Sequence, residues 1–238
     1  MSSEQDPFES ARTELVLANH ILARHGVVDG WGHVSVRKPG APDRFILARS
    51  LAPALVTEDD LLELDVATGE TVDGGRSYLE RHIHSGIYRA RPDVTAVVHS
   101  HAPDLIPFGV TDTELLPLLH VSAFLGQGAP RFEIRDAAGP ATGMLVDTPA
   151  LGDALGAALG DAPIVLMRGH GVSVVGSSVR EAVYRAVYAR QNARAQLQTL
   201  ALGGTPVYLN RDEARLASAN VDRSVDRVWD LWVRETAG

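Results

Sequence analysis

Two histidines separated by one residue, His99 and His101, follow the apolar stretch 94–98, which reads Val-Thr-Ala-Val-Val. Residues of this kind are typical of a buried strand. Because side chains two apart on a strand point to the same face, we expect the two imidazoles to converge on one point. Imidazole is the commonest protein ligand for metal ions and suits zinc, iron, nickel and copper. Taken alone, the pair fits two ordinary polar residues at a strand end as well as it fits a metal site.

Two more segments carry residue types that bind metals. Glu80 lies 19 residues before His99, and His170 lies far downstream between two glycines, where the apolar runs 163–167 and 172–175 meet. Three histidines and one carboxylate are typical of a catalytic metal site with an open coordination position. We therefore predict four metal ligands, which are Glu80, His99, His101 and His170.

A mixture of helices and strands must position these residues. Apolar residues at helical spacing, with capping residues and glycines at the ends, predict helices over 7–25, 79–91, 149–159, 179–202 and 212–234. Short β-prone runs predict strands over 34–37, 45–48, 61–65, 94–98, 132–134, 163–167 and 172–175. Strands and helices do not alternate strictly, and no internal repeat or linker interrupts them. We therefore expect a single α/β domain over residues 1–238.

The helix predicted over 79–91 has two kinds of face. Leu79 begins an apolar stripe along one side, whereas Glu80 and His84 are four residues apart and share another face. His82 is expected on the helix surface. For His84, a surface position and a position in the site both stay open.

The composition limits the function classes. The formal charge of −8 at pH 7 gives no basic surface of the kind that binds nucleic acid. The chain has no cysteine, which excludes disulfides and thiolate metal sites. The acidic N-terminus lacks the basic and apolar regions of a signal peptide, and no run reaches the ~18 apolar residues of a membrane span. We expect a cytoplasmic protein that binds neither nucleic acid nor membrane.

In combination, the motifs resemble those of the class II aldolase/adducin family, whose prototypes are fuculose-phosphate aldolase and ribulose-phosphate 4-epimerase. The matching tracts are Glu80, Arg91-Pro92-Asp93, the strand 94–98, His99-Ser100-His101 and His170-Gly171. The resemblance covers a core over residues 10–202, followed by a helical tail over 203–238. It implies a three-layer α/β/α fold around a central, mainly antiparallel sheet.

The resemblance also implies roles for the candidate residues. His99, His101 and His170 would bind a divalent metal ion, most often zinc, with manganese, iron and magnesium as alternatives. Glu80 would be an acid/base beside the metal. Family members commonly form homotetramers with active sites near subunit interfaces, so a homo-oligomer is expected.

Phosphosugar members of the family hold their phosphate with three small polar segments, and at least two of these are replaced here. The family's Gly-Asn-x-Ser reads Gly32-His33-Val34-Ser35, and Tyr78-Leu79 replaces two serines just before the glutamate. The remaining segment reads Ala48-Arg49-Ser50-Leu51. A phosphorylated sugar is therefore not the expected substrate. Because arginine can hold a carboxylate through two N–H groups, we predict that His33, Arg49 and Ser50 bind a small carboxylate substrate.

Four tracts resemble a decarboxylase branch of the family that acts on ring-derived acids in aromatic-compound degradation, such as dihydroxyphthalates and carboxylated muconic semialdehydes. They are residues 82–88, 99–103, 124–126 and 168–171. This implies a metal-dependent decarboxylase of a hydroxy- or keto-substituted carboxylic acid, in which the metal stabilises the enolate left by departing CO2. Glu80 is the first candidate for proton transfer, and for that role its pKa would need to be raised by burial.

Three other functions stay open. A class II aldolase or dehydratase acting on a non-phosphorylated substrate would use the same metal to polarise a carbonyl. A non-heme iron oxygenase is chemically compatible with a site of histidines and a carboxylate. An adducin-like interaction module would share the fold without the metal chemistry. The presence of all four predicted ligands argues against the interaction module.

Overall fold

The structure, a computed structural model, describes residues 6–236. Its centre is one seven-stranded sheet in the order β3-β2-β1-β4-β7-β6-β5. The strands are β1 His33–Arg37, β2 Arg44–Ala48, β3 Leu61–Asp65, β4 Ala96–Ser100, β5 Arg131–Phe132, β6 Ile164–Met167 and β7 Gly171–Gly176. Every neighbouring pair is antiparallel except β5 and β6, which are parallel. The expectation of a mainly antiparallel central sheet is confirmed.

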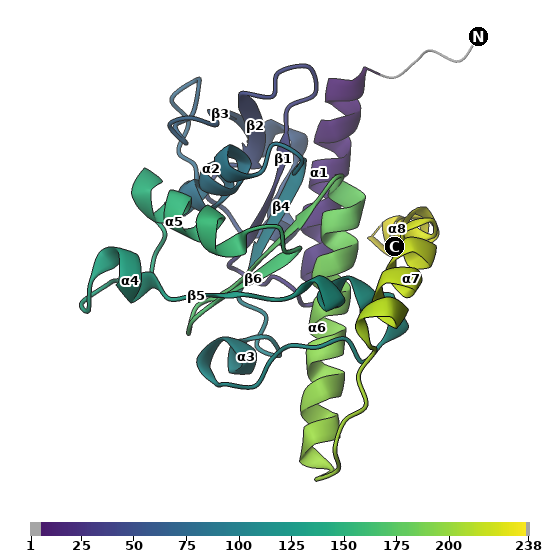
Figure 1. The fold of residues 1–238 in the computed structure, drawn as a ribbon. Helices are drawn as coiled ribbons and strands as arrows, with labels where there is room; N and C mark the ends of the chain where they lie inside the picture. The colour runs from purple at the N-terminus through teal and green to yellow at the C-terminus, as the bar shows by residue number, and fades with distance from the viewer. Residues whose placement is uncertain (1–5, 237–238) are drawn as a thin grey trace.

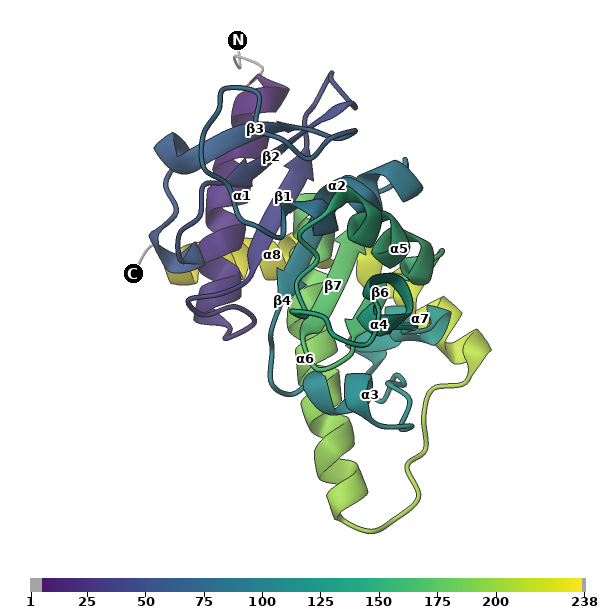
Figure 2. The same ribbon diagram turned by 90° about the vertical axis from the view of Figure 1, so that its left-hand side faces the viewer.

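Helices cover both faces of the sheet and give three layers (Figure 1). Helices α1, α6 and α8 pack on one face, and α2 and α5 pack on the other (Figures 1 and 2). The helices are α1 Pro7–Arg24, α2 Arg81–Ala90, α3 Ile106–Val110, α4 Ile134–Ala138, α5 Pro149–Leu159, α6 Val179–Ala201, α7 Arg211–Asp222 and α8 Val225–Thr236. Three short 3-10 segments are η1 Pro53–Leu55, η2 Glu58–Asp60 and η3 His120–Gln127. Among the described residues, no helix is both long and apolar enough to span a bilayer.

The strands bury side chains on both faces, as a sheet between two helical layers must. In β2, Phe45 and Leu47 point into the core under α2 and α5, whereas Ile46 and Ala48 point into the core under α1 and α6. This explains why several strands read as continuous apolar runs rather than as alternating patterns.

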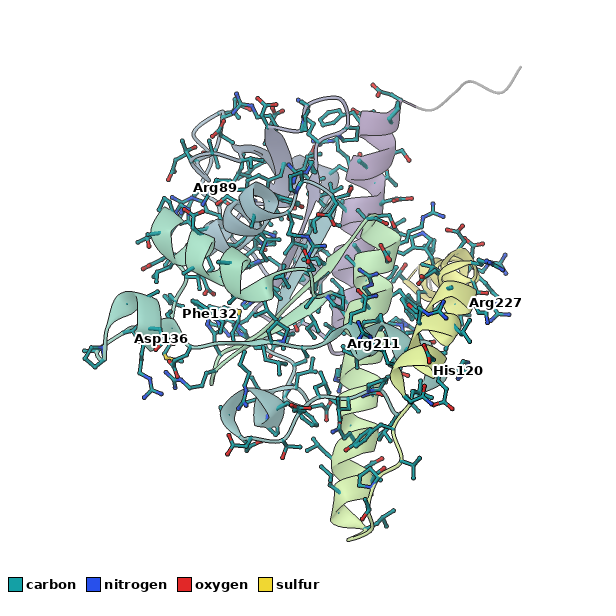
Figure 3. All side chains as sticks on the ribbon, in the orientation of Figure 1. Arg89, His120, Phe132, Asp136, Arg211 and Arg227 are labelled. Carbon is teal, nitrogen blue, oxygen red and sulfur yellow. The ribbon has the colours of Figure 1, made fainter. Side chains whose placement is uncertain are left out.

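Helix α2 approaches α5 so closely that only glycine fits at the contact. A Cβ on Gly86 would lie 2.1 Å from the carbonyl oxygen of Gly152, and a Cβ on Gly152 would lie 2.2 Å from the carbonyl oxygen of His82. Arg89 of α2 (Figure 3) also hydrogen-bonds to Asp153 of α5 over 2.8 Å. The two helices therefore pack as one layer, which fixes the start of α2.

Several element boundaries differ from the sequence prediction. Helix α2 begins at Arg81 rather than at residue 79, and Leu79, expected on the buried stripe, is 66% exposed. The strand predicted over 132–134 is only the two-residue β5, because the chain turns into α4 at Ile134. The single helix predicted in the tail is two helices, α7 and α8, separated at residues 223–224.

Candidate active site

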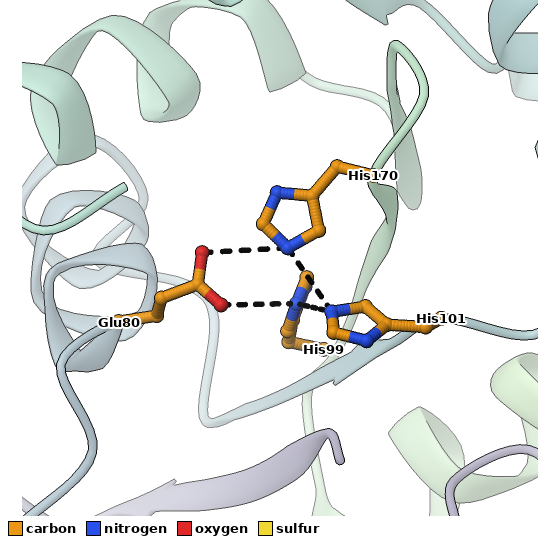
Figure 4. Close-up of side chains that lie close together, drawn as sticks. All are labelled: Glu80, His99, His101 and His170. Atoms are coloured by element: carbon orange, nitrogen blue, oxygen red, sulfur yellow. Dashed lines mark hydrogen bonds and ion pairs between the residues drawn. The ribbon is translucent and has the colours of Figure 1, made fainter. Parts of the chain in front are cut away.

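Three segments converge at one end of the sheet. His99 is the penultimate residue of β4 and His101 follows the strand, while His170 lies in the turn between β6 and β7. Strand β4 pairs with β7, so the turn that carries His170 lies beside the end of β4. Glu80 stands at the N-terminus of α2, which packs over the same end (Figure 4).

The four side chains point their ligand atoms at one another (Figure 4). One potential ligand atom from each residue lies within 4.8 Å of the others. The Nε2 atom of His101 is 3.0 Å from Nε2 of His99 and 3.0 Å from Nε2 of His170. The carboxylate of Glu80 lies 3.4 Å from Nε2 of His170 and 3.9 Å from Nε2 of His99. Nitrogens bound to one tetrahedral ion are roughly 3.3 Å apart, so this spacing fits a shared divalent cation.

Backbone groups orient two members of the cluster. The Nδ1 of His99 is 3.0 Å from the carbonyl oxygen of Val172, which can only accept a hydrogen bond. Nδ1 must therefore carry the proton, and Nε2 presents a bare lone pair to the other ligands. The backbone N–H of Val146 donates to Oε1 of Glu80 over 3.1 Å. Both contacts hold ligand atoms in the position that metal binding requires.

The cluster also sets the protonation of its members. Burial lowers the pKa of His99 well below its ordinary value, which keeps the imidazole neutral and able to bind a metal. Burial raises the pKa of Glu80, but the hydrogen bond from His170 outweighs it and brings the pKa to about 2. The expectation of a raised pKa at Glu80 is therefore wrong for the protein as it stands. Glu80 is a carboxylate at neutral pH because two histidines face it.

A pocket of about 240 Å³ opens beside the cluster. Glu80, His101, His33 and Ser50 contribute polar groups to its wall, and the exposed Trp31 belongs to a largely apolar remainder. A dry cavity of about 150 Å³ can hold benzene, so the pocket suits a small ring or chain with a few substituents. A larger hollow of about 1020 Å³, between α7 and the end of α5, contains none of the four cluster residues.

The chain is similar to known proteins over most of its length. The family described as Class II Aldolase and Adducin N-terminal domain matches residues 13–197. The chain belongs to this family. It is 38% identical over 240 residues to the decarboxylase tropJ of Talaromyces stipitatus, covering 91% of this chain and 90% of that protein. It is 34% identical over 209 residues to 3,4-dihydroxyphthalate decarboxylase of Arthrobacter keyseri, covering 82% of this chain and 80% of that protein.

Solved structures show the same fold. L-Fuculose 1-phosphate aldolase from Glaciozyma antarctica PI12 superposes with a TM-score of 0.80 at 21% identity, covering 99% of this chain and 92% of that one. At this identity the likeness concerns the fold alone. Together with the relatives that are decarboxylases, the family membership establishes an enzyme of the lyase class.

Within this class II aldolase fold, the residues predicted to bind substrate separate into two groups. His33 and Ser50 line the pocket beside the cluster. Arg49 does not line it, and its Nε donates to Oδ1 of Asp60 over 2.6 Å. The structure thus brings His33 and Ser50 into one pocket with Glu80 and His101, whereas Arg49 pairs with Asp60.

The burial of two polar residues of α2, His82 and His84, was not predicted from the sequence. His82, expected on the surface, is 3% exposed, and His84 is fully buried with its Nε2 2.6 Å from Nδ1 of His33. The reason is that α5 covers one side of α2 and the turn at Gly69 covers His82. A signal was present, because Ser35 lies two residues after His33 on β1, the spacing at which strand side chains share a face.

Proposed function

We propose that this family member is a divalent-metal-dependent decarboxylase of a small hydroxy- or keto-substituted carboxylic acid from aromatic-compound degradation. The observation that carries the proposal is the cluster of Glu80, His99, His101 and His170, of which Glu80 and His101 line a small pocket. Three relatives that are decarboxylases match most of the chain at more than 30% identity, and they favour loss of CO2 over aldol cleavage.

The donor set fits a divalent cation. His99, His101 and His170 would hold it through their Nε2 atoms, and the Glu80 carboxylate is close enough to join them. Neutral imidazoles leave the cation its full charge, and zinc suits such ligands best, with manganese, iron and magnesium as alternatives. When bound, a divalent cation supplies Lewis-acid stabilisation of the negative charge that develops on a substrate oxygen.

The chain's own residues would handle the proton and the substrate. When the bond to the carboxyl carbon breaks, CO2 leaves and the electron pair remains on the substrate, so one proton must reach the carbon. Decarboxylation of a carboxylate consumes one net proton, and Glu80 is ionised, so we propose that Glu80 takes this proton from solvent and relays it to that carbon. His33 and Ser50 would orient the substrate, and the apolar part of the wall would keep water from competing.

Product analysis tests this proposal against the other family chemistries. The purified protein is incubated with ortho-hydroxy aromatic acids and semialdehyde acids, and CO2, aldehydes and oxygen consumption are recorded. We expect one CO2 per substrate consumed, without oxygen uptake. An aldehyde fragment instead of CO2 would identify an aldolase, and oxygen-dependent turnover would identify an oxygenase. Either result would overturn the proposal.

A further inference from the structure

A chain of hydrogen-bonded side chains leads from the pocket into the protein core. It begins at His33 on the pocket wall and ends at a backbone carbonyl. The contacts are His33 Nδ1 to His84 Nε2 at 2.6 Å, His84 Nδ1 to Ser35 Oγ at 2.6 Å, Ser35 Oγ to Tyr88 OH at 2.8 Å, and Tyr88 OH to the Thr95 carbonyl oxygen at 3.3 Å. None of these residues belongs to the metal cluster.

Solvent water cannot replace any of these hydrogen-bond partners, because the four side chains are buried. His33 is 4% exposed, Tyr88 is 1% exposed, and Ser35 and His84 are fully buried. Burial also lowers the pKa of His33 and brings that of His84 to about 3, and it raises the pKa of the Tyr88 hydroxyl. The hydrogen-bond partners of His84 are His33 and Ser35, and neither is an acidic group that would favour a second proton on its ring. A buried polar group without a partner is costly, so the arrangement that satisfies most groups is strongly preferred.

The end of the chain favours one direction for its hydrogen bonds. The Thr95 carbonyl accepts the backbone N–H of Arg37 over 2.7 Å and has room for a second donor, which is the Tyr88 hydroxyl. The Thr95 carbonyl can only accept, so the Tyr88 hydroxyl donates to it and in turn accepts from Ser35. The Ser35 oxygen then accepts from Nδ1–H of His84, whose bare Nε2 accepts from Nδ1–H of His33. The opposite direction would leave the Tyr88 and Thr95 oxygens facing each other without a hydrogen between them.

This direction leaves Nε2 of His33 without a proton. Among the described residues Nε2 has no hydrogen-bond partner, and His33 lines the pocket. A bare imidazole nitrogen accepts hydrogen bonds and repels a carboxylate. The expectation that His33 would hold a substrate carboxylate therefore does not match its surroundings.

We propose that His33 is a specificity-determining residue that accepts a hydrogen bond from a substrate hydroxyl. His84, Ser35 and Tyr88 are positioning residues that fix its tautomer. The inference rests on the proposed function and narrows its substrate class to carboxylic acids that also carry a hydroxyl group beside the part that reaches the metal cluster. Acids that lack the hydroxyl, or carry it as a methyl ether, are disfavoured.

The tautomer can be read directly by nitrogen NMR of the zinc-loaded protein with 15N-labelled histidine. We expect a bare Nε2 and a protonated Nδ1 at His33 in the wild type, with signals assigned by their loss in His33→Gln. In Tyr88→Phe, the Ser35 hydroxyl loses its acceptor and should donate to His84 instead. That change reverses the chain and moves the His33 proton to Nε2.

Tyr184→Phe is the matched control, because Tyr184 is also a buried tyrosine whose hydroxyl donates to a backbone carbonyl, that of Val121. It should leave the His33 tautomer unchanged. If Tyr88→Phe does not fold, Ser35→Ala breaks the same chain one step earlier and should give a mixture of His33 tautomers.

The affinities of three benzoates, with and without an ortho-hydroxyl group, test whether His33 selects for that hydroxyl. We expect 2-hydroxybenzoate to bind the wild type about 10-fold more tightly than 2-methoxybenzoate or benzoate, the ratio typical of one hydrogen bond. In Tyr88→Phe the ratio should fall to about 1, while Tyr184→Phe keeps the wild-type ratio. A structural defect alone would weaken all three probes equally and leave the ratio unchanged.

Three results would overturn the inference: a protonated Nε2 at His33 in the wild type, an unchanged tautomer in Tyr88→Phe, or no preference for the hydroxylated probe. The proposed decarboxylation can be rejected independently of the role of His33. Absence of CO2 from any acid, with a bare Nε2 and the expected probe ratio, would remove the reaction and leave the role of His33 in place.

Discussion

At Glu80, a carboxylate faces two imidazoles of a metal-binding cluster and accepts a hydrogen bond from the backbone of Val146. We expect Glu80→Gln to retain bound metal through the three histidines and to lose about 10²- to 10⁴-fold in turnover, because an amide cannot carry the proton. Metal content by mass spectrometry and CO2 release by the same preparation measure the two effects.

His101→Ala is the control for this prediction, since it should lose the metal as well as the activity. Full activity in Glu80→Gln would remove Glu80 from the reaction. Loss of metal in that variant would instead make the carboxylate a required ligand.

Most residues of the candidate site could be predicted from the sequence. That Glu80, His99, His101 and His170 lie together could be predicted, because His-x-His after a strand and the two other polar residues form a recognisable set. The pairing of Arg49 with Asp60 could not, because it depends on η2 folding back against the end of β2. The burial of His82 could not either, since it results from helix and loop packing that local spacing does not encode.

Among the elements, the contact between α2 and α5 matters most for the site, because Glu80 is the N-cap residue of α2. We expect Gly86→Ala to destabilise the protein by about 1–3 kcal/mol, since its Cβ would collide with the backbone of α5. The shift of α2 should also weaken metal binding. Chemical denaturation and metal titration measure both effects.

Gly204→Ala is the matched control, because a Cβ there meets no atom within 4 Å. Equal stability of the two variants would contradict the close packing of α2 on α5.

Asp60, in the turn before β3, is expected to make the stability of the protein depend on pH. The backbone N–H of Thr57, its hydroxyl and Arg49 all donate to Asp60 and lower the pKa of that carboxyl below its ordinary 3.8. The contribution of Asp60 to stability is therefore present above pH 3.8 and is lost as the pH falls through the lowered value. We expect Asp60→Asn to be less stable by about 1 kcal/mol at pH 7.

The difference between wild type and Asp60→Asn should shrink as the pH falls below 3.8, which denaturation at a series of pH values can follow. The exposed neighbour variant Asp59→Asn is the control and should match the wild type at pH 7. A difference for Asp60→Asn that does not change with pH would contradict the assigned role of its charge.

Element types followed from local patterns more readily than element positions did. Apolar runs such as 163–167 and caps such as Ser178 marked strands and helices close to their observed bounds. The sheet order joins β1 to β4 and β4 to β7, and such distant pairings leave no trace in local spacing. Family resemblance supplied the architecture that periodicity alone did not.

For the whole molecule, the expected homotetramer stays a prediction. Large apolar side chains that are exposed on one chain, including Trp31 at 72% and Val207 at 89%, would be covered in an assembly. We expect light scattering to give about 102 kDa, four times the 25.5 kDa of one chain. A mass of one chain at micromolar concentration would contradict this prediction.

We propose above all that the cluster of one glutamate and three histidines holds the divalent cation needed for decarboxylation. The most direct measurement is CO2 release from ortho-hydroxy aromatic acids and semialdehyde acids before chelation, after chelation and after stepwise return of zinc or manganese. We expect chelation to abolish CO2 release and one equivalent of metal per chain to restore it. Undiminished CO2 release from metal-free protein would contradict this proposal.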